Sequence, residues 1–110
     1  MKKILITGAN GDIGEAIGRI LIKEFPNFII DGADCKGTMP GLFIFNEMIN
    51  LPIATDKKYI KNIVDLSQEY DLIIPTSESE IKVISSIIIK YDLPLLILPK
   101  PMLDIFFDKY

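Results

Sequence analysis

The feature that most constrains this chain is a glycine-rich turn between a short apolar segment and an amphipathic one. Residues Lys3–Thr7 contain the apolar run Ile4–Ile6, and Gly8, Gly11 and Gly14 follow with the spacing G-x-x-G-x-x-G. A short apolar run that ends at glycine predicts a strand buried on both faces, as in a parallel sheet. Over residues 13–21 the apolar positions switch to helical spacing. The sequence therefore predicts a strand–turn–helix unit whose glycines permit a tight turn and close backbone packing.

The glycine turn is also a candidate site for an anion. The first N–H groups of a helix carry partial positive charge and suit a phosphate or carboxylate. The acid expected to bind a ribose is Asp34, twenty residues beyond Gly14. Asp31 competes for this role, and each acid is equally compatible with a solvated turn. The glycines alone are also compatible with packing against a neighbouring domain. The candidate cofactor-binding residues are Gly8, Asn10, Gly11, Gly14 and Asp34.

Strand-like and helix-like segments alternate along the rest of the chain. Asn10 or Asp12 is expected to cap the first helix, and Pro26 to end it. Strands are predicted at 28–30, 51–53, 72–74 and 95–98, and helices at about 55–69, 77–91 and 101–110, with an ambiguous segment at 42–48. This alternation predicts an α/β fold of the Rossmann type. We expect one domain, 1–110, a three-layer sandwich with a parallel sheet of about five strands in the order 3-2-1-4-5.

This strand order places two polar segments side by side. Ligands of such folds bind at the carboxyl ends of the strands, where the strand order reverses. That point lies between the strand before Gly8 and the strand that ends at Pro75. The glycine turn should therefore face residues 76–80. Within that segment Ser77 and Glu80 have the spacing of a capping box, which we favour for them over ligand binding.

Composition excludes several classes of function. Twelve basic and 15 acidic residues give a net charge of −3 and an isoelectric point near 4.8, so no nucleic-acid partner is expected. Cys35 is the single cysteine and histidine is absent, which excludes Ser-His-Asp and Cys-His catalysis within this chain, and ordinary zinc sites. No catalytic or metal-binding residue is assigned. The lone thiol favours a cytoplasmic location, and the apolar stretches are too short to cross a membrane.

The glycine turn resembles that of short-chain dehydrogenases and epimerases, which bind NAD(P). That family uses a Tyr-x-x-x-Lys pair as its acid–base group. Four residues after Tyr59, Tyr70 and Tyr91 come two isoleucines and a leucine, and Tyr110 is the last residue. The pair is absent, so no reductase site can be assembled. An NAD(P)-binding Rossmann domain stays as the alternative interpretation.

Five segments, taken in order, carry a second resemblance that covers essentially the whole chain. They are Lys3–Gly8 with the following glycines, Phe28–Asp34, Asn50–Pro52 with Tyr59–Ile60, Asp71–Glu80, and Phe107–Tyr110. This order is similar to that of the N-terminal, pre-ATP-grasp domain of carbamoyl-phosphate-synthase-like ATP-grasp proteins. The predicted last helix has an apolar face and no C-cap, which favours a longer protein, although the helix could instead dock on its own sheet.

This second resemblance implies the substrate-side domain of an ATP-grasp carboxylate–amine or carbamoyl-phosphate-synthase-like ligase. Such a domain is inactive without its ATP-binding domain, in the same or a partner chain. The complete protein would use ATP and magnesium to activate a small-molecule carboxylate as an acyl phosphate. A homodimer is left open, as is an interaction module that uses Phe106 and Phe107. The implied substrate-binding residues are Thr76, Ser77, Glu78 and Glu80, with Glu78 the freer carboxylate.

Overall fold

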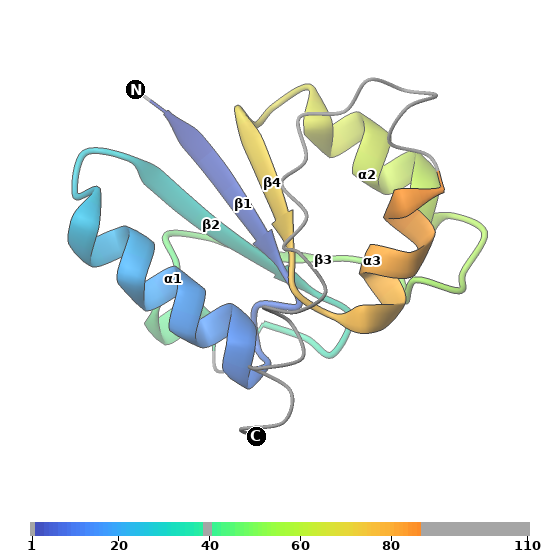
Figure 1. Cartoon of the computed structure of the whole chain (residues 1–110), viewed down its shortest axis with the longest axis horizontal. Coiled ribbons are helices and arrows are strands. Elements are labelled where there is room, and N and C mark those ends of the chain that lie inside the picture. The colour runs from blue at the N-terminus through green and yellow to red at the C-terminus, as the bar shows by residue number, and fades with distance from the viewer. Residues whose placement is uncertain (1, 39–40, 87–110) are drawn as a thin grey trace.

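A computed structural model of the chain describes residues 2–38 and 41–86. Its elements are β1 (Lys3–Thr7), α1 (Asp12–Glu24), β2 (Ile29–Asp34), the 3-10 turn η1 (Gly41–Phe43), β3 (Met48–Asn50), α2 (Tyr59–Ser67), β4 (Leu72–Pro75) and α3 (Glu78–Ser85). The four strands form one parallel sheet in the order β3-β2-β1-β4. Helix α1 lies on one face, and α2 and α3 lie on the other (Figure 1). The predicted three-layer Rossmann-like fold is confirmed.

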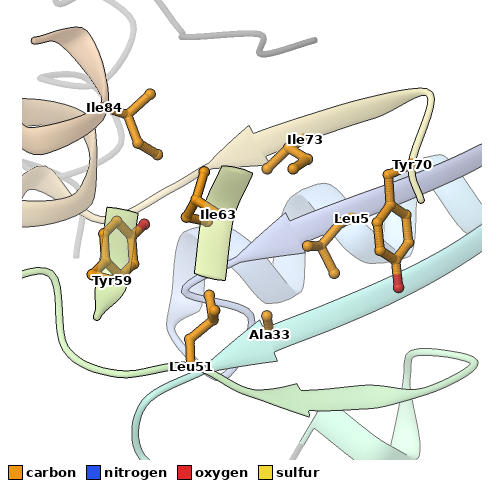
Figure 2. Close-up of a cluster of buried hydrophobic side chains, with 8 residues drawn as sticks. All are labelled: Leu5, Ala33, Leu51, Tyr59, Ile63, Tyr70, Ile73 and Ile84. Atoms are coloured by element: carbon orange, nitrogen blue, oxygen red, sulfur yellow. The ribbon is translucent and has the colours of Figure 1, made fainter. Parts of the chain in front are cut away.

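The core is divided by the sheet into two clusters. Successive side chains of a strand point to opposite faces, so β1 contributes Leu5 to one cluster and Ile4 and Ile6 to the other. The cluster beneath α2 and α3 holds two tyrosines at its opposite ends (Figure 2). Tyr59 lies toward the carboxyl ends of the strands, and Tyr70 lies near their beginnings. Each face of the sheet therefore has its own apolar core, and a tyrosine lies at each end of the cluster beneath α2 and α3.

Two strands differ from the sequence prediction. Strand β2 continues through Asp34 rather than ending at residue 30, because the buried Asp31 carboxylate finds hydrogen-bond donors inside the fold. The third strand is residues 48–50 rather than 51–53. Leu51 N donates the last bond of this strand region to Asp34 O at 3.0 Å, and Pro52 has no N–H to continue the pairing. The predicted strand at 95–98 and helix at 101–110 lie outside the described residues.

The helices begin where local hydrogen bonds allow. Gly11 is the N-cap of α1 and there is no side-chain cap, so the predicted cap at Asn10 or Asp12 is wrong. Helix α2 begins at Tyr59, later than predicted, because turns at Asp56 occupy the preceding segment. The Ser77 cap of α3 is confirmed, since its hydroxyl accepts from Glu80 N at 3.3 Å. None of the helices described here has the length and apolar character needed to cross a membrane.

Candidate functional site

A cleft lies at the carboxyl ends of the strands, where the sequence analysis placed the ligand. The part lined by the glycine turn, Asp34 and Glu80, which we call the main cleft, has a volume of about 330 Å³. A second hollow of about 360 Å³ adjoins it at the start of α1 and shares Gly8, Gly11 and Ser77. The main cleft is lined by Gly8, Asn10, Gly11, Asp34, Cys35, Lys36, Leu51, Pro52, Ile53, Ala54, Ser77, Ser79 and Glu80. The structure therefore brings the glycine turn and the segment after β4 together.

The glycine turn leaves little room for side chains. Gly8 has a φ of +67°, and a Cβ there would lie 2.6 Å from Thr76 Oγ1. A Cβ on Gly14 would lie 2.4 Å from Gly8 O, which is backbone. At Gly11 the nearest atom would be 3.4 Å away, an ordinary contact distance. Gly8 and Gly14 are thus required by packing, whereas Gly11 keeps the start of α1 open to the cleft.

Asn10 and Asp34 hold the turn against the end of β2. The two Asp34 carboxylate oxygens accept from Asn10 N at 2.9 Å and from Lys36 N at 3.0 Å. The Asn10 side chain donates to Gly37 O at 2.9 Å and accepts from Gly41 N at 2.8 Å. Both residues line the cleft, but their polar atoms are already engaged with backbone. Ligand binding by them stays a prediction, and their visible role is to fix the shape of the turn.

The residues after β4 are similarly engaged. Thr76 is buried, and its hydroxyl donates to Thr7 O at 2.7 Å, which joins the end of β4 to the end of β1. The Ser77 hydroxyl donates to Glu80 Oε1 at 2.9 Å. Glu78 is exposed and is absent from the described lining of both hollows. Of the four predicted substrate-binding residues, Ser77 and Glu80 line the main cleft and Thr76 lines the adjoining hollow.

The Glu80 carboxylate has a second partner that the sequence did not reveal. Tyr59, the first residue of α2, is fully buried, and its hydroxyl donates to Glu80 Oε2. Burial and the neighbouring Glu80 charge raise the pKa of Tyr59 far above its ordinary value near 10. The Thr7 hydroxyl is also buried and has no hydrogen-bond partner among the described residues. The bond from Tyr59 to Glu80 thus joins α2 to α3 beside the cleft.

Cys35 lies at the mouth of the cleft beside charged groups. Its side chain is exposed and follows Asp34 directly. Partial burial first, and then the Asp34 and Glu80 carboxylates, raise the pKa of this thiol above its ordinary value, while Lys36 opposes them. The opposite wall is formed by residues 51–54, which connect β3 to α2. Sequence analysis assigned no ligand role to this wall, to Lys36 or to Cys35.

Asp31, the competing ribose-binding candidate, lies elsewhere. It is fully buried in β2 and is absent from the described lining of the cleft. One carboxylate oxygen accepts from Asn46 Nδ2 and Glu47 N, each at 3.2 Å, and the other accepts from Tyr70 OH at 2.7 Å. Desolvation first, and then this bond to Asp31, raise the pKa of Tyr70 far above 10. Asp31 therefore serves the interior of the sheet.

A protein-family model matches most of the chain. The model of the PylC-like, N-terminal domain matches residues 4–92, which includes every described element except the first residue of β1. The chain belongs to this family. Membership agrees with the predicted pre-ATP-grasp domain, while the narrower likeness to carbamoyl-phosphate synthase stays a prediction.

Solved structures similar to this PylC-like domain include a synthetase and a dehydratase. N5-carboxyaminoimidazole ribonucleotide synthetase from Thermotoga maritima superposes with a TM-score of 0.61 at 21% identity, over 96% of this chain and 27% of that one. The dTDP-glucose 4,6-dehydratase from Bacillus anthracis, in complex with NAD, gives 0.60 at 10% identity, over 88% and 36%. At these identities the likenesses establish the fold.

One curated relative is similar in sequence. Bifunctional polymyxin resistance protein ArnA from Wigglesworthia glossinidia brevipalpis is 36% identical over 75 residues, which is 68% of this chain. The matched part is 11% of that relative's length. The PylC-like domain thus spans about a tenth of this relative and about a quarter to a third of the solved structures.

The two buried tyrosines predict a loss of stability in alkali. Their folded-state pKa values lie above the ordinary value near 10, so above pH 10 the unfolded state loses these protons first. The free energy of unfolding should therefore fall as pH rises beyond 10, by about 1.4 kcal/mol per unit for each tyrosine. Urea denaturation between pH 9 and 11.5 measures this slope.

Phenylalanine variants assign the alkaline effect. Tyr59→Phe and Tyr70→Phe should each reduce the slope of the free energy of unfolding against pH by the contribution of one proton. The lysines and the other titrating groups contribute equally in all three proteins. A slope that is the same in the wild type and both variants would show that neither tyrosine carries the effect.

Proposed function

We propose that this domain forms the substrate side of an ATP-grasp ligase that joins a small-molecule carboxylate to an amine. The observation that carries the proposal is the cleft between the glycine turn and the segment after β4, in a PylC-like N-terminal domain. The synthetase from T. maritima has the same fold over 96% of the chain, which supports the proposal. ATP and magnesium would be held by a second domain, in the same or a partner chain.

Within this proposal the cleft binds the substrate through groups that internal bonds leave available. Gly11 presents the uncapped start of α1, whose N–H groups favour a carboxylate or phosphate. Lys36, which follows β2, and Ser79, in the first turn of α3, line the same space. Asn10, Asp34, Ser77 and Glu80 would act mainly by holding these groups in place, because their polar atoms already have partners. Gly11 is then a contact that the sequence analysis predicted, whereas Lys36 and Ser79 are contacts that it did not predict.

The proposal predicts which kinetic constant a cleft variant changes. In the complete protein, Gly11→Val should raise the KM for the carboxylate by about tenfold or more, because the new side chain enters the cleft beside the α1 N-terminus. The KM for ATP should stay unchanged. Steady-state release of ADP, measured with a panel of carboxylates and amines, gives both constants.

The control is Glu15→Gln, a change at a half-buried position on α1 that removes the surface pair with Arg19. It should leave both constants at the wild-type values. A Gly11→Val protein with a raised KM for ATP and an unchanged KM for the carboxylate would contradict a substrate-side role.

The alternative function is NAD(P) binding. The open start of α1 beside Asp34, together with the fold shared with the NAD-bound dehydratase, favours it. Against it, both Asp34 carboxylate oxygens already accept hydrogen bonds from backbone N–H groups. A ribose-binding acid accepts hydrogen bonds from the ribose hydroxyl groups instead. Calorimetry of this chain with NAD and NADP separates the two functions. Micromolar binding that Gly11→Val abolishes would establish the alternative, and the ligase proposal expects none.

A further inference from the structure

The buried hydrogen bond between Tyr59 and Glu80 has no role in the proposed function as stated so far. Glu80 lies on α3, and its carboxylate reaches the cleft although the residue is only 8% exposed. One oxygen accepts from the hydroxyl of Ser77, the N-cap of the same helix, and the other accepts from Tyr59 OH on α2. Placing a carboxylate in such a setting is costly unless donors hold it. The Tyr59 hydroxyl is therefore one of the two donors that keep Glu80 in place.

The Glu80 carboxylate also packs against the glycine turn. Its Oε1 atom lies 3.3 Å from the point where a Gly8 Cβ would be, so the carboxylate packs directly against the turn. Helix α2 follows the apolar wall of the cleft at residues 51–54. The hydrogen bond from Tyr59, the first residue of α2, to Glu80 thus connects the wall at residues 51–54 to the glycine turn through the interior of the domain.

We propose that Tyr59 is a positioning residue of the cleft, which holds the Glu80 carboxylate against the Gly8 turn and so fixes the charge at the cleft floor. The inference rests on the proposed function only in taking this cleft as the face that binds a ligand. Helix α2, which contributes no residue to the described lining, then controls the cleft through one hydroxyl group. Sequence analysis missed Tyr59 because its partner lies 21 residues away.

Cys35 provides a reporter for the position of Glu80. It is the one cysteine of the chain, it is exposed, and it lines the same cleft. The charged and titratable groups that act on it are Asp34, Lys36, Glu80 and Tyr59. Because only the thiolate reacts, the rate of alkylation by iodoacetamide as a function of pH gives the pKa of this thiol. The assay needs no nucleotide or substrate, so its failure would be distinct from failure of the ligase proposal.

The experiment compares the pH profile of Cys35 alkylation in the wild type, in Glu80→Gln, in Tyr59→Phe and in the double variant. Glu80→Gln removes a negative charge and should lower the Cys35 pKa by roughly half a unit, which is about a threefold rise in thiolate near neutral pH. Tyr59→Phe should also lower it, because a carboxylate without its donor turns toward water, where its charge is screened. In the Glu80→Gln background, Tyr59→Phe should change nothing further. This absence of additivity shows that Tyr59 acts through Glu80.

Tyr70→Phe is the matched control. It also removes a buried hydroxyl that donates to a carboxylate, but at the opposite end of the same core cluster (Figure 2). It should cost similar stability and leave the Cys35 profile unchanged. The proposal is overturned if Tyr59→Phe leaves the Cys35 pKa at the wild-type value, or if Tyr70→Phe shifts it equally. An unchanged profile in Glu80→Gln would overturn it as well, because the Glu80 charge would then not act at the cleft.

Discussion

Gly14→Ala is expected to destabilise the domain by about 3 kcal/mol or more, which lowers the melting temperature by about 15 °C for a domain of this size. The added Cβ would lie 2.4 Å from Gly8 O and 2.9 Å from Ala9 Cα. Both neighbours are backbone, so neither can rotate away as a flexible side chain would. Relief requires α1 to move away from the end of β1, and that movement opens the core on this face. Thermal and urea denaturation measure the loss.

Gly11→Ala is the matched control within the same turn. Its Cβ would have Gly8 O at 3.4 Å as its nearest neighbour, and its φ of −79° suits any residue. Alanine is a poorer N-cap than glycine but restricts the unfolded chain, so the net change should be within about 1 kcal/mol. Equal losses at both positions would mean that the turn, rather than close packing at Gly14, limits stability. Together the two variants separate the glycine needed for the fold from the glycine that faces the cleft.

The part of the fold that local patterns specify was predictable. The run from Lys3 to Gly8 and the helical spacing after it define the first strand, turn and helix, and the alternation of later segments defines the parallel sheet. The switch point then placed Gly8 and Ser77 on one cleft, which the structure confirms. These predictions depended on periodicity and on rules of connection, which short segments of sequence express.

Three of the errors share a physical origin in long-range hydrogen bonds. Asp31 suggested that the second strand ends early, yet its carboxylate is buried and satisfied by donors 15 to 39 residues away. Asn10 was expected to cap α1, yet it binds backbone at Gly37 and Gly41. Tyr59 was taken only as part of a helix start, yet it holds Glu80. A polar residue in sequence shows what it can bond, but only the fold supplies its partner.

Asp31→Ala is expected to cost about 2 to 4 kcal/mol, because it leaves the buried Tyr70 hydroxyl and two donors on exposed residues without their acceptor. These donors are Tyr70 OH, Asn46 Nδ2 and Glu47 N. They come from the segments before β3 and β4, so one carboxylate fastens both outer strands to β2. The free energy of unfolding in urea measures the loss. Asp71→Ala serves as the control, since Asp71 accepts from Lys3 N at 2.8 Å but is exposed to water, and it should cost about 1 kcal/mol or less.

A second substitution tests why Asp31 matters. If the loss comes from donors left without partners, then removing one donor should recover part of it. Tyr70→Phe in the Asp31→Ala background should therefore give a protein about 1 to 2 kcal/mol more stable than the sum of the two single losses predicts. Strict additivity would instead assign the loss to the cavity left by the aspartate side chain. Asp31 and Tyr70 are absent from the described lining of the cleft. The folded protein of each variant should therefore keep the wild-type pH profile of Cys35 alkylation. Such a result would show that the Asp31 carboxylate supports the sheet, whereas the Glu80 carboxylate supports the cleft.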